Sequence, residues 1–417
     1  MAREMVDSGC KYLGIIPNDW KVNKFKYYLL RRDVKNRSDC EVLSLYREHG
    51  IVIKNSRDDN HNVTSEDTSK YRYVRINDFV VNKMKAWQGS VAISEYEGIV
   101  SPAYYVYEFS DDSYCPKYFH YLLRSAYKNE FRRLSGGIRE GQWDLSTNAL
   151  ENILVILPPL PEQQKIAAFL DDKCAEIDSL IADIQREIDK LERLKRSVIA
   201  EAVTKGLDKN AEMKDSGVIW APVIPKSWKP LKVKYIMYET KTKADTETAE
   251  PLSVTQKYGI IKSSEATVAN PSQSYEGYKA VSIDDIVFNK YKAHSGVFFS
   301  STYNGMVTFN YSVYRCYEGN VPKYYEYLFH TDGCIGEFKT KMHGVGESIS
   351  PLYTKDLFAI TVIQPTYTDQ KDIVAFLDAR CAEFDTILSE KQKQIEILQK
   401  LKKSVIYEYV TGKKEVK

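Results

Sequence analysis

The sequence contains the same module twice. AFLDDKCAEID begins at Ala168 and AFLDARCAEFD begins at Ala375, about half the chain later. Other segments recur in the same order: IPNDWK (16–21) as IPKSWK (224–229), NDFVVNKMKA (77–86) as DDIVFNKYKA (284–293), and LKRSVIAEAVT (194–204) as LKKSVIYEYVT (401–411). Two copies are too few for a solenoid. We therefore predict a tandem duplication of one domain with its helix, related by an approximate two-fold axis.

Composition narrows the class of protein. Of the 417 residues, 43% are hydrophobic and 28% are charged, as in ordinary soluble globular proteins. No apolar run of about 20 residues is present to span a bilayer. The opening MAREMVDSG lacks the apolar core of a secretory signal. We therefore expect a cytoplasmic location.

The net charge and the pattern of cysteines and histidines exclude further classes of protein. The net charge of +2 excludes a chain coated in Lys and Arg, but leaves room for local basic patches. The 7 cysteines show no C-x-x-C spacing and the 6 histidines form no ligand pattern. We therefore expect neither a disulfide framework nor a metal site.

A long helix is predicted after Pro161. The segment has no Gly or Pro until Gly206 and is rich in strong helix-forming residues. Its apolar residues recur at the spacing of a coiled-coil seam. The predicted seam consists of Ile177, Ile181, Ile184, Ile188, Leu191, Leu194 and Val198 in the first copy, and of Phe384, Leu388, Ile395, Leu398, Leu401 and Val405 in the second.

Each of these helices needs a partner that covers its apolar stripe. The partner we expect is the other copy, because both helices belong to one chain. Two-fold symmetry then predicts an antiparallel coiled coil with one globular domain at each end. Lys391 replaces Ile184 in the second copy, and we expect this break in symmetry to help fix the register. The alternative is a helix that only connects the two halves.

The length of the seam bears on function. From Ile177 to Val203 is roughly 26 residues, or about 40 Å of helix. On duplex DNA, about 40 Å corresponds to roughly 12 base pairs. Two domains held that far apart suit two DNA half-sites about one helical turn apart. Any elongated partner of that length fits the same geometry.

The segments outside the helices predict an α+β fold. Runs rich in β-branched and aromatic residues predict strands in IVIKN, YRYVRINDFVVNKM, SVAISEY and YYVYEF, and in KAVSIDDIVFNKY, GVFFSS and YSVYRCYE. One helix per copy is expected, near KYFHYLLRSAYKNEFRRL and KYYEYLFHTDGCIGEFKTKM. We expect these elements to surround a twisted, mostly antiparallel sheet. The chain then divides into module 1 (1–157), a first helical region (158–208), module 2 (209–364) and a second helical region (365–417).

Candidate DNA-binding residues occupy equivalent places in both modules. They fall in the repeated NK-x-KA motif, in the line LSLYREHGIV and its copy LSVTQKYGII, and near a glycine-bearing loop (LSGGIREGQW and MHGVGES), where backbone can approach a phosphate closely. Module 1 supplies Arg47, Asn82, Lys83, Lys85, Trp87, Gln88, Arg139 and Gln142; module 2 supplies Lys257, Asn289, Lys290, Lys292, His294, Lys341 and His343. The alternative is that these loops are ordinary solvated turns.

The combination LPPLPEQQKIAAFLDDKCAEIDSLI…LKRSVIAEAVTKGL, repeated after a second module, resembles the specificity subunits of type I restriction-modification systems. GIVSPAYYVY and NKMKAWQG are similar to stretches of their target recognition domains. The second copy departs from the pattern, because YTDQKDIVAFL replaces the apolar-Pro-Glu-Gln run at the entry to its helix.

The resemblance implies a function. Each module would be a target recognition domain that reads one half of an asymmetric, bipartite DNA sequence, and the paired helices would set the spacing. The helices would also bind two methyltransferase subunits, which use S-adenosylmethionine. With two restriction subunits added, the complex would translocate and cleave DNA with ATP and Mg²⁺. The chain itself would carry no cofactor.

The chain shows no catalytic motif of its own. It lacks [ND]-P-P-[FYW], since Pro158-Pro159 is followed by Leu160, and it lacks the G-x-x-x-x-G-K-[ST] phosphate loop. Cys174 and Cys381 stand in register within the helices, as packing residues would. We expect a non-catalytic DNA-reading subunit. Two alternatives stay open: a protein-interaction scaffold with aromatic surfaces, and a catalytic chain with an unrecognised site.

Overall fold

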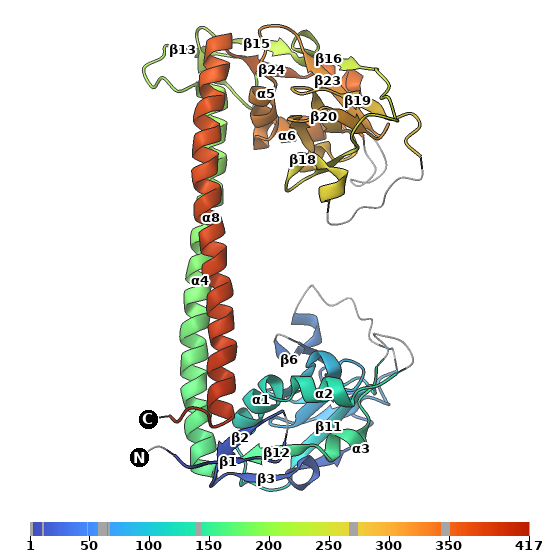
Figure 1. Ribbon diagram of the computed structural model, residues 1–417, viewed down its shortest axis with the longest axis vertical. Helices are drawn as coiled ribbons and strands as arrows, with labels where there is room; N and C mark the ends of the chain where they lie inside the picture. The colour runs from blue at the N-terminus through green and yellow to red at the C-terminus, as the bar shows by residue number, and fades with distance from the viewer. Residues whose placement is uncertain are drawn as a thin grey trace. The chain divides into compact units, whose positions relative to one another are not determined.

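A computed structural model gives the fold (Figure 1). It describes residues 3–10, 12–47, 49–56, 65, 67–137, 143–266, 274–342 and 351–416. These divide into two compact units: unit 1 combines Met1–Ile184 with Gln392–Lys417, and unit 2 is Gln185–Lys391. Each unit thus contains one module and part of both long helices.

Module 1 is built around a four-stranded antiparallel sheet of order β4-β11-β8-β9. Its central strand β11 pairs Val106 with Arg32 on one side and with Val80 on the other. Two-stranded pairs β1-β2, β12-β3, β10-β7 and β5-β6 surround it. The strands are β1 Met5–Asp7, β2 Ile15–Pro17, β3 Lys21–Lys24, β4 Leu29–Arg32, β5 Leu43–Tyr46, β6 Gly50–Ile53, β7 Arg72–Val74, β8 Phe79–Asn82, β9 Val91–Ile93, β10 Gly98–Val100, β11 Tyr104–Phe109 and β12 Leu154–Leu157.

Module 2 repeats this topology strand for strand. Its main sheet has the order β16-β23-β20-β21, with the pairs β13-β14, β15-β24, β19-β22 and β17-β18. The strands are β13 Met213–Asp215, β14 Val223–Pro225, β15 Lys229–Lys232, β16 Met237–Thr240, β17 Leu252–Thr255, β18 Gly259–Lys262, β19 Lys279–Val281, β20 Ile286–Asn289, β21 Phe298–Ser300, β22 Gly305–Val307, β23 Tyr311–Cys316 and β24 Thr361–Gln364. The predicted duplication and the α+β class are confirmed.

Where one helix per module was predicted, the structure has two, and that prediction was wrong. Module 1 has α1 Pro116–Ser125 and α2 Lys128–Leu134, and module 2 has α5 Pro322–Phe329 and α6 Asp332–Lys341. In module 2, Thr331 ends the continuous pattern, because its side chain caps the second helix by accepting from the Cys334 N–H. The short helices α3 Thr147–Glu151 and α7 Thr354–Ala359, and the 3-10 turns η1 to η6, were not predicted.

The 3-10 turns also come in equivalent pairs. They are η1 Phe25–Tyr27, η2 Lys54–Ser56 and η3 Ala86–Gln88 in module 1, and η4 Val233–Tyr235, η5 Ser263–Glu265 and η6 Ala293–Ser295 in module 2. The pair η3 and η6 follows the NK motif directly.

The two long helices are α4 Leu160–Lys205 and α8 Tyr367–Val410. A buried glutamine holds the first turn of each long helix in place. The Gln163 amide accepts from the Cys115 N–H at 2.9 Å and donates to the Pro158 carbonyl at 2.9 Å. The Gln370 amide accepts from the Val321 N–H at 2.8 Å and donates to Pro365 at 3.1 Å. The α8 entry therefore keeps the same device despite its divergent sequence.

The repeated IP-x-x-W lead-in meets the acidic residue that precedes this glutamine. The Trp20 Nε1–H donates to Glu162 at 3.1 Å, and the Trp228 Nε1–H donates to Asp369 at 2.8 Å. Asp369 thus replaces Glu162 functionally in the second copy. These bonds anchor each lead-in on the helix that follows its own module.

The far end of each long helix closes the other unit. The Tyr118 hydroxyl donates to the Val410 carbonyl at 3.0 Å, and the Tyr324 hydroxyl donates to Val203 at 2.8 Å. Complete burial raises the pKa of both tyrosines, so each stays protonated and able to donate. Unit 1 therefore takes its last helical turns from α8, and unit 2 takes its from α4 (Figure 1).

Contacts within each unit confirm that the helices run antiparallel. In unit 1, Lys402 binds Asp178 at 2.6 Å. In unit 2, the equivalent Lys195 binds Asp385 at 2.6 Å. The ring of Phe169, near the start of α4, lies 4.5 Å from that of Tyr409, near the end of α8.

The predicted seam is corrected at one position in each helix. Leu194 and Leu401 are 52% and 47% exposed, so neither lies in the seam. Lys195 and Lys402 take their places: their stems are partly buried, and each ammonium group reaches an aspartate on the facing helix. A third ion pair, Lys391–Glu187 at 2.6 Å, lies in unit 2. Its lysine is the predicted symmetry-breaking residue, and a role in register stays a prediction.

Candidate nucleic-acid interface

The NK motif forms a corner at the end of a central strand in each module. In module 1, β8 ends at Asn82, and η3 follows with Gly89 at a φ of 89° as its cap. The Asn82 carboxamide accepts from the Met84 N–H at 3.2 Å, and Asn289 accepts from the Tyr291 N–H at 3.1 Å. Asn82 is 7% exposed. We therefore assign it to shaping the corner rather than to the interface.

The tip of a hairpin lies against this corner. In module 1 the β5-β6 hairpin carries Arg47, whose guanidinium donates to the Gln88 side chain at 2.8 Å. In module 2 the β17-β18 hairpin carries Gln256, whose amide donates to the Ser295 carbonyl at 3.0 Å. The structure thus brings Arg47 to Gln88, two predicted residues from segments far apart in the sequence. Lys257 follows Gln256 on its hairpin tip.

A third segment returns to the same corner after the glycine-bearing loop. The Leu145 N–H donates to the Lys83 carbonyl at 3.0 Å, and the Leu352 N–H donates to the Lys290 carbonyl at 2.8 Å. The Lys83 ammonium also binds Asp144 at 3.2 Å. The predicted residues Arg139, Gln142 and His343 lie outside the described residues.

Aromatic and basic side chains complete each corner differently. In module 1, Trp87 packs against Trp143 with ring centroids 5.4 Å apart. Trp143 was missed from the sequence, where only its place after the glycine-bearing loop gave a signal. In module 2, His294 occupies the place of Trp87, and the Lys257 ammonium lies 5.0 Å from the ring of Tyr258. Lys85 and Lys292 are exposed at equivalent positions.

Lys341 does not join the corner of module 2 in this way. It ends α6 and lines a cavity together with Glu337, Trp220 and Lys232. None of the residues that line this cavity belongs to the NK motif or to the β17-β18 hairpin.

The chemistry of these corners is that of binding rather than catalysis. Arginine and lysine suit phosphates, glutamine suits base edges, and aromatic rings suit bases or sugars. The described residues include no group of His, Cys, Asp and Glu side chains placed to hold a metal ion. Burial raises the pKa of the Cys174 and Cys381 thiols, which disfavours a nucleophilic thiolate.

Comparison with known proteins connects this geometry to a family. The family model described as "Type I restriction modification DNA specificity domain" matches residues 46–190, which include the module 1 corner and the first part of α4. A putative type I restriction enzyme MjaX specificity subunit of Methanocaldococcus jannaschii is 22% identical over 432 residues, covering 97% of this chain and 96% of that protein. The chain is thus similar, over nearly its whole length, to a type I restriction enzyme specificity subunit.

Other specificity subunits share shorter stretches with this chain. The type I restriction enzyme EcoBI specificity subunit of Escherichia coli is 32% identical over 102 residues, which is 24% of this chain and 21% of that protein. A solved structure from work on complex assembly in the type I restriction-modification system has the same fold: the TM-score is 0.68 at 14% identity, over 95% of this chain and 98% of that one. Within the described residues, no helix of this chain is long and apolar enough to cross a membrane.

Proposed function

We propose that this chain is the DNA-reading subunit of a type I restriction-modification complex and is not catalytic by itself. Module 1 (1–157) and module 2 (209–364) each read one half of an asymmetric, bipartite target. The helical regions 158–208 and 365–417 set the separation of the two halves.

One observation carries this proposal: the same basic corner is built twice on the same backbone, with different side chains. Both corners join the end of a central strand, a hairpin tip and the segment after a glycine-bearing loop. Arg47 and Gln88 meet in module 1, whereas Gln256 and the Ser295 backbone meet in module 2. A shared scaffold with different contact groups suits two readers of two different sequences.

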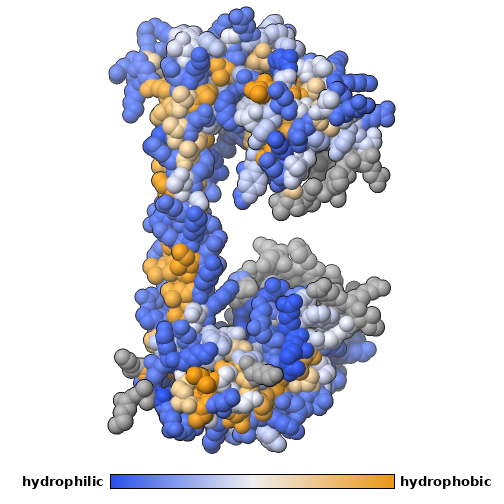
Figure 2. All heavy atoms as spheres, in the orientation of Figure 1, coloured by the Kyte–Doolittle hydropathy of each residue, from blue (hydrophilic) through white to orange (hydrophobic). Residues whose placement is uncertain are grey.

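The helix pair supports a second role, the docking of partner subunits. In unit 1 the pair exposes Leu180 on α4 (46%) and Ile397 and Leu401 on α8 (63% and 47%). Figure 2 shows apolar side chains on the visible face of the paired helices. Exposed apolar residues gathered on a surface are typical of a protein-binding site. We assign this surface to a methyltransferase subunit and expect two such subunits and two restriction subunits per complex. S-adenosylmethionine, ATP and Mg²⁺ would bind those partners, and a cytoplasmic location is part of the proposal.

The other candidate function is a protein-binding scaffold without DNA. The comparisons do not favour it, and salt dependence distinguishes the two. Binding that neutralises phosphates weakens steeply as salt rises, whereas an apolar interface does not. A DNA affinity that is unaffected by salt between about 50 and 200 mM would contradict DNA reading by the lysines and arginines of these corners.

The proposal is tested by mapping DNA methylation. The chain is produced with its methyltransferase subunit in a host that lacks other adenine methylation, and methylated adenines are located across the genome. We expect one motif made of two specified halves separated by a gap of unspecified bases. A continuous motif without a gap would contradict the two-reader proposal.

The two NK lysines are predicted to differ in their contribution to DNA binding. Lys290 has no ion-pair partner among the described residues, whereas the charge of Lys83 is partly neutralised by Asp144. Lys290→Ala should therefore make the negative slope of log affinity against log salt shallower by about 0.9, the value for one lost phosphate contact. Lys83→Ala should make it shallower by a smaller amount. Titration of a labelled target duplex at several salt concentrations measures both slopes. Equal slopes for both variants and the wild type would place the lysines outside the interface.

A further inference from the structure

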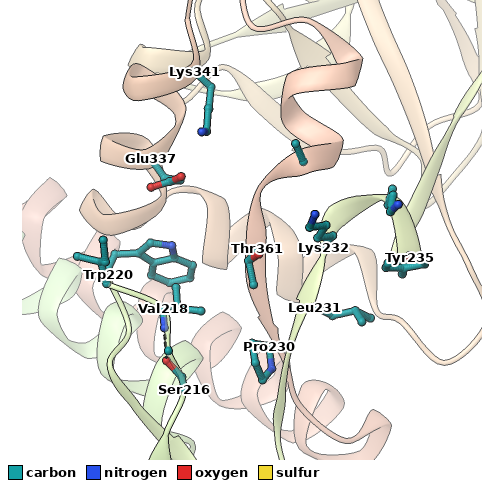
Figure 3. A pocket seen from close by; sticks show the side chains of 14 residues that line it. Ser216, Val218, Trp220, Pro230, Leu231, Lys232, Tyr235, Glu337, Lys341 and Thr361 are labelled. Atoms are coloured by element: carbon teal, nitrogen blue, oxygen red, sulfur yellow. Dashed lines mark hydrogen bonds between the residues drawn. The ribbon is translucent and has the colours of Figure 1, made fainter.

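Unit 2 contains a cavity of about 560 Å³ that the proposed DNA-reading role does not use. It lies between the loop that holds Trp220, strand β15 with Lys232, the end of α6 with Glu337 and Lys341, and Thr361 on β24 (Figure 3). Figure 3 shows Trp220, Glu337 and Lys341 directed into the same space.

Several hydrogen-bond donors line the cavity. Lys232, Lys234 and Lys341 line it, and no ion pair within the described residues involves any of the three ammonium groups. The Trp220 Nε1–H is buried and has no hydrogen-bond partner among the described residues. A buried N–H without an acceptor is unfavourable, and an acceptor from a ligand would satisfy it. Among the described residues that line the cavity, Glu337 is the one acidic residue.

Unit 1 satisfies the equivalents of Trp220 and Glu337 internally. Tyr12 stands in the place of Trp220 and donates its hydroxyl to the Leu154 carbonyl at 2.8 Å. Glu130, the counterpart of Glu337, is paired with Arg133 at 2.6 Å. Leu134 stands in the place of Lys341. Lys24 and Lys26, the counterparts of Lys232 and Lys234, likewise have no ion pair among the described residues. The unpaired Trp220 N–H and the Lys341 ammonium are therefore the features particular to module 2.

We propose that this cavity binds a phosphate group. Three ammonium groups and an indole N–H suit a small anion with several acceptor oxygens, and lysine is a common phosphate ligand. The Glu337 carboxylate opposes the anion and thereby limits its affinity. Lys341 stands shortly before residues 343–350, the glycine-bearing segment predicted to approach DNA. The phosphate belongs either to the DNA backbone, in which case the inference rests on the proposed function, or to a free phosphate compound.

The DNA source is tested through the salt dependence of binding by the full chain. Lys341→Leu introduces the residue that module 1 carries at the equivalent position. This variant should make the negative slope of log affinity against log salt shallower by about 0.9, the value for one lost phosphate contact. Trp220→Phe, which removes the N–H together with the five-membered ring of the indole but no charge, should weaken binding of the same duplex without changing the slope by a full contact. The matched control is Lys24→Leu, at the module 1 counterpart of Lys232, and it should leave the slope unchanged.

Binding of a free phosphate compound is tested by calorimetric titration of the chain without DNA, with inorganic phosphate as the probe. Binding that disappears in Lys341→Leu and strengthens in Glu337→Gln would support a phosphate site. Weaker phosphate binding in Glu337→Gln would show that this carboxylate does not oppose a bound anion and would overturn the proposal.

The outcomes separate this inference from the proposed function. Normal DNA binding by Lys341→Leu, together with no phosphate binding by the wild type, would overturn the cavity proposal and leave DNA reading intact. Failure of the wild type to bind DNA would contradict the proposed function, and the phosphate titration would then decide the cavity alone. An equal change of slope in Lys24→Leu would show a general effect of surface charge and would also overturn the cavity proposal.

Discussion

Trp228→Ala is expected to destabilise unit 2 by about 3–5 kcal/mol, the cost of truncating a large buried aromatic side chain. Trp228 is 2% exposed and donates to Asp369 at the start of α8. Its ring also lies under Gly206 at the end of α4, where an added Cβ would be 3.1 Å from the ring. One side chain therefore holds the start of one long helix and the end of the other. Urea unfolding of the full chain measures the cost.

Hydrogen exchange resolves where that loss occurs. In Trp228→Ala, amides around Val203 and at the start of α8 should lose protection, whereas those around Val410 should keep it. Trp20→Ala, the equivalent change in unit 1, should give the opposite pattern. A destabilisation below about 1 kcal/mol, which is outside the range for such truncations, would contradict the anchoring role. Equal loss of protection in both units would do the same.

Gly305→Ala is expected to destabilise module 2 by about 3 kcal/mol, the upper end of the usual range for overpacking. A Cβ at this position would lie 2.4 Å from the Glu250 carbonyl oxygen and 2.8 Å from Leu252. The nearer of these two atoms belongs to the backbone. The Glu250 carbonyl is also held in place, because it accepts a hydrogen bond from the neighbouring Met306 N–H. The chain cannot move away without breaking the contact that positions β17. A fall in the urea midpoint measures the effect.

The matched control in the same module is Gly336→Ala. Gly336 lies inside α6, and an added Cβ would meet no atom within 4 Å. Alanine is favoured over glycine in a helix interior by about 0.5–1 kcal/mol, so this variant should be slightly more stable than the wild type. If the two variants had equal stabilities, close approach at Gly305 would not be what requires glycine there.

The duplication made much of the fold predictable. Repeated segments showed two modules of one topology, and the apolar spacing predicted α4, α8 and their antiparallel pairing, which contacts in each unit confirm. The seam prediction failed where only apolar residues were considered. Lys195 and Lys402 continue the seam, because a lysine stem packs as an apolar group while its ammonium group reaches an aspartate.

Contacts between residues far apart in the chain could not be predicted from the sequence. IP-x-x-W and P-E-Q-Q were both visible as motifs, but the bond between Trp20 and Glu162 joins residues far apart in the chain, and no local rule connects them. The division of one predicted helix into α1 and α2 likewise depends on tertiary packing, since Tyr127 at the break is fully buried. Helical propensity alone does not report such burial.

The candidate interface was predictable in part. The NK motif and the line containing Arg47 were identified separately, and the structure brings Arg47 and Gln88 into contact. Whether these residues contact DNA stays a prediction. The sequence could not show that the Asn82 side chain turns inward or that Lys341 lines a separate cavity, because both depend on how the elements pack.

The proposed role of the paired helices is to set the distance between the two reading modules. Its most direct test adds one heptad to each helix, after Ile184 in α4 and after Lys391 in α8, so that the seam stays in register. Seven residues add about 10 Å of helix, which corresponds to about three base pairs of duplex. The methylation motif made by this variant with its methyltransferase subunit should keep both half-site sequences and gain about three base pairs in the gap. A motif with an unchanged gap would contradict this role.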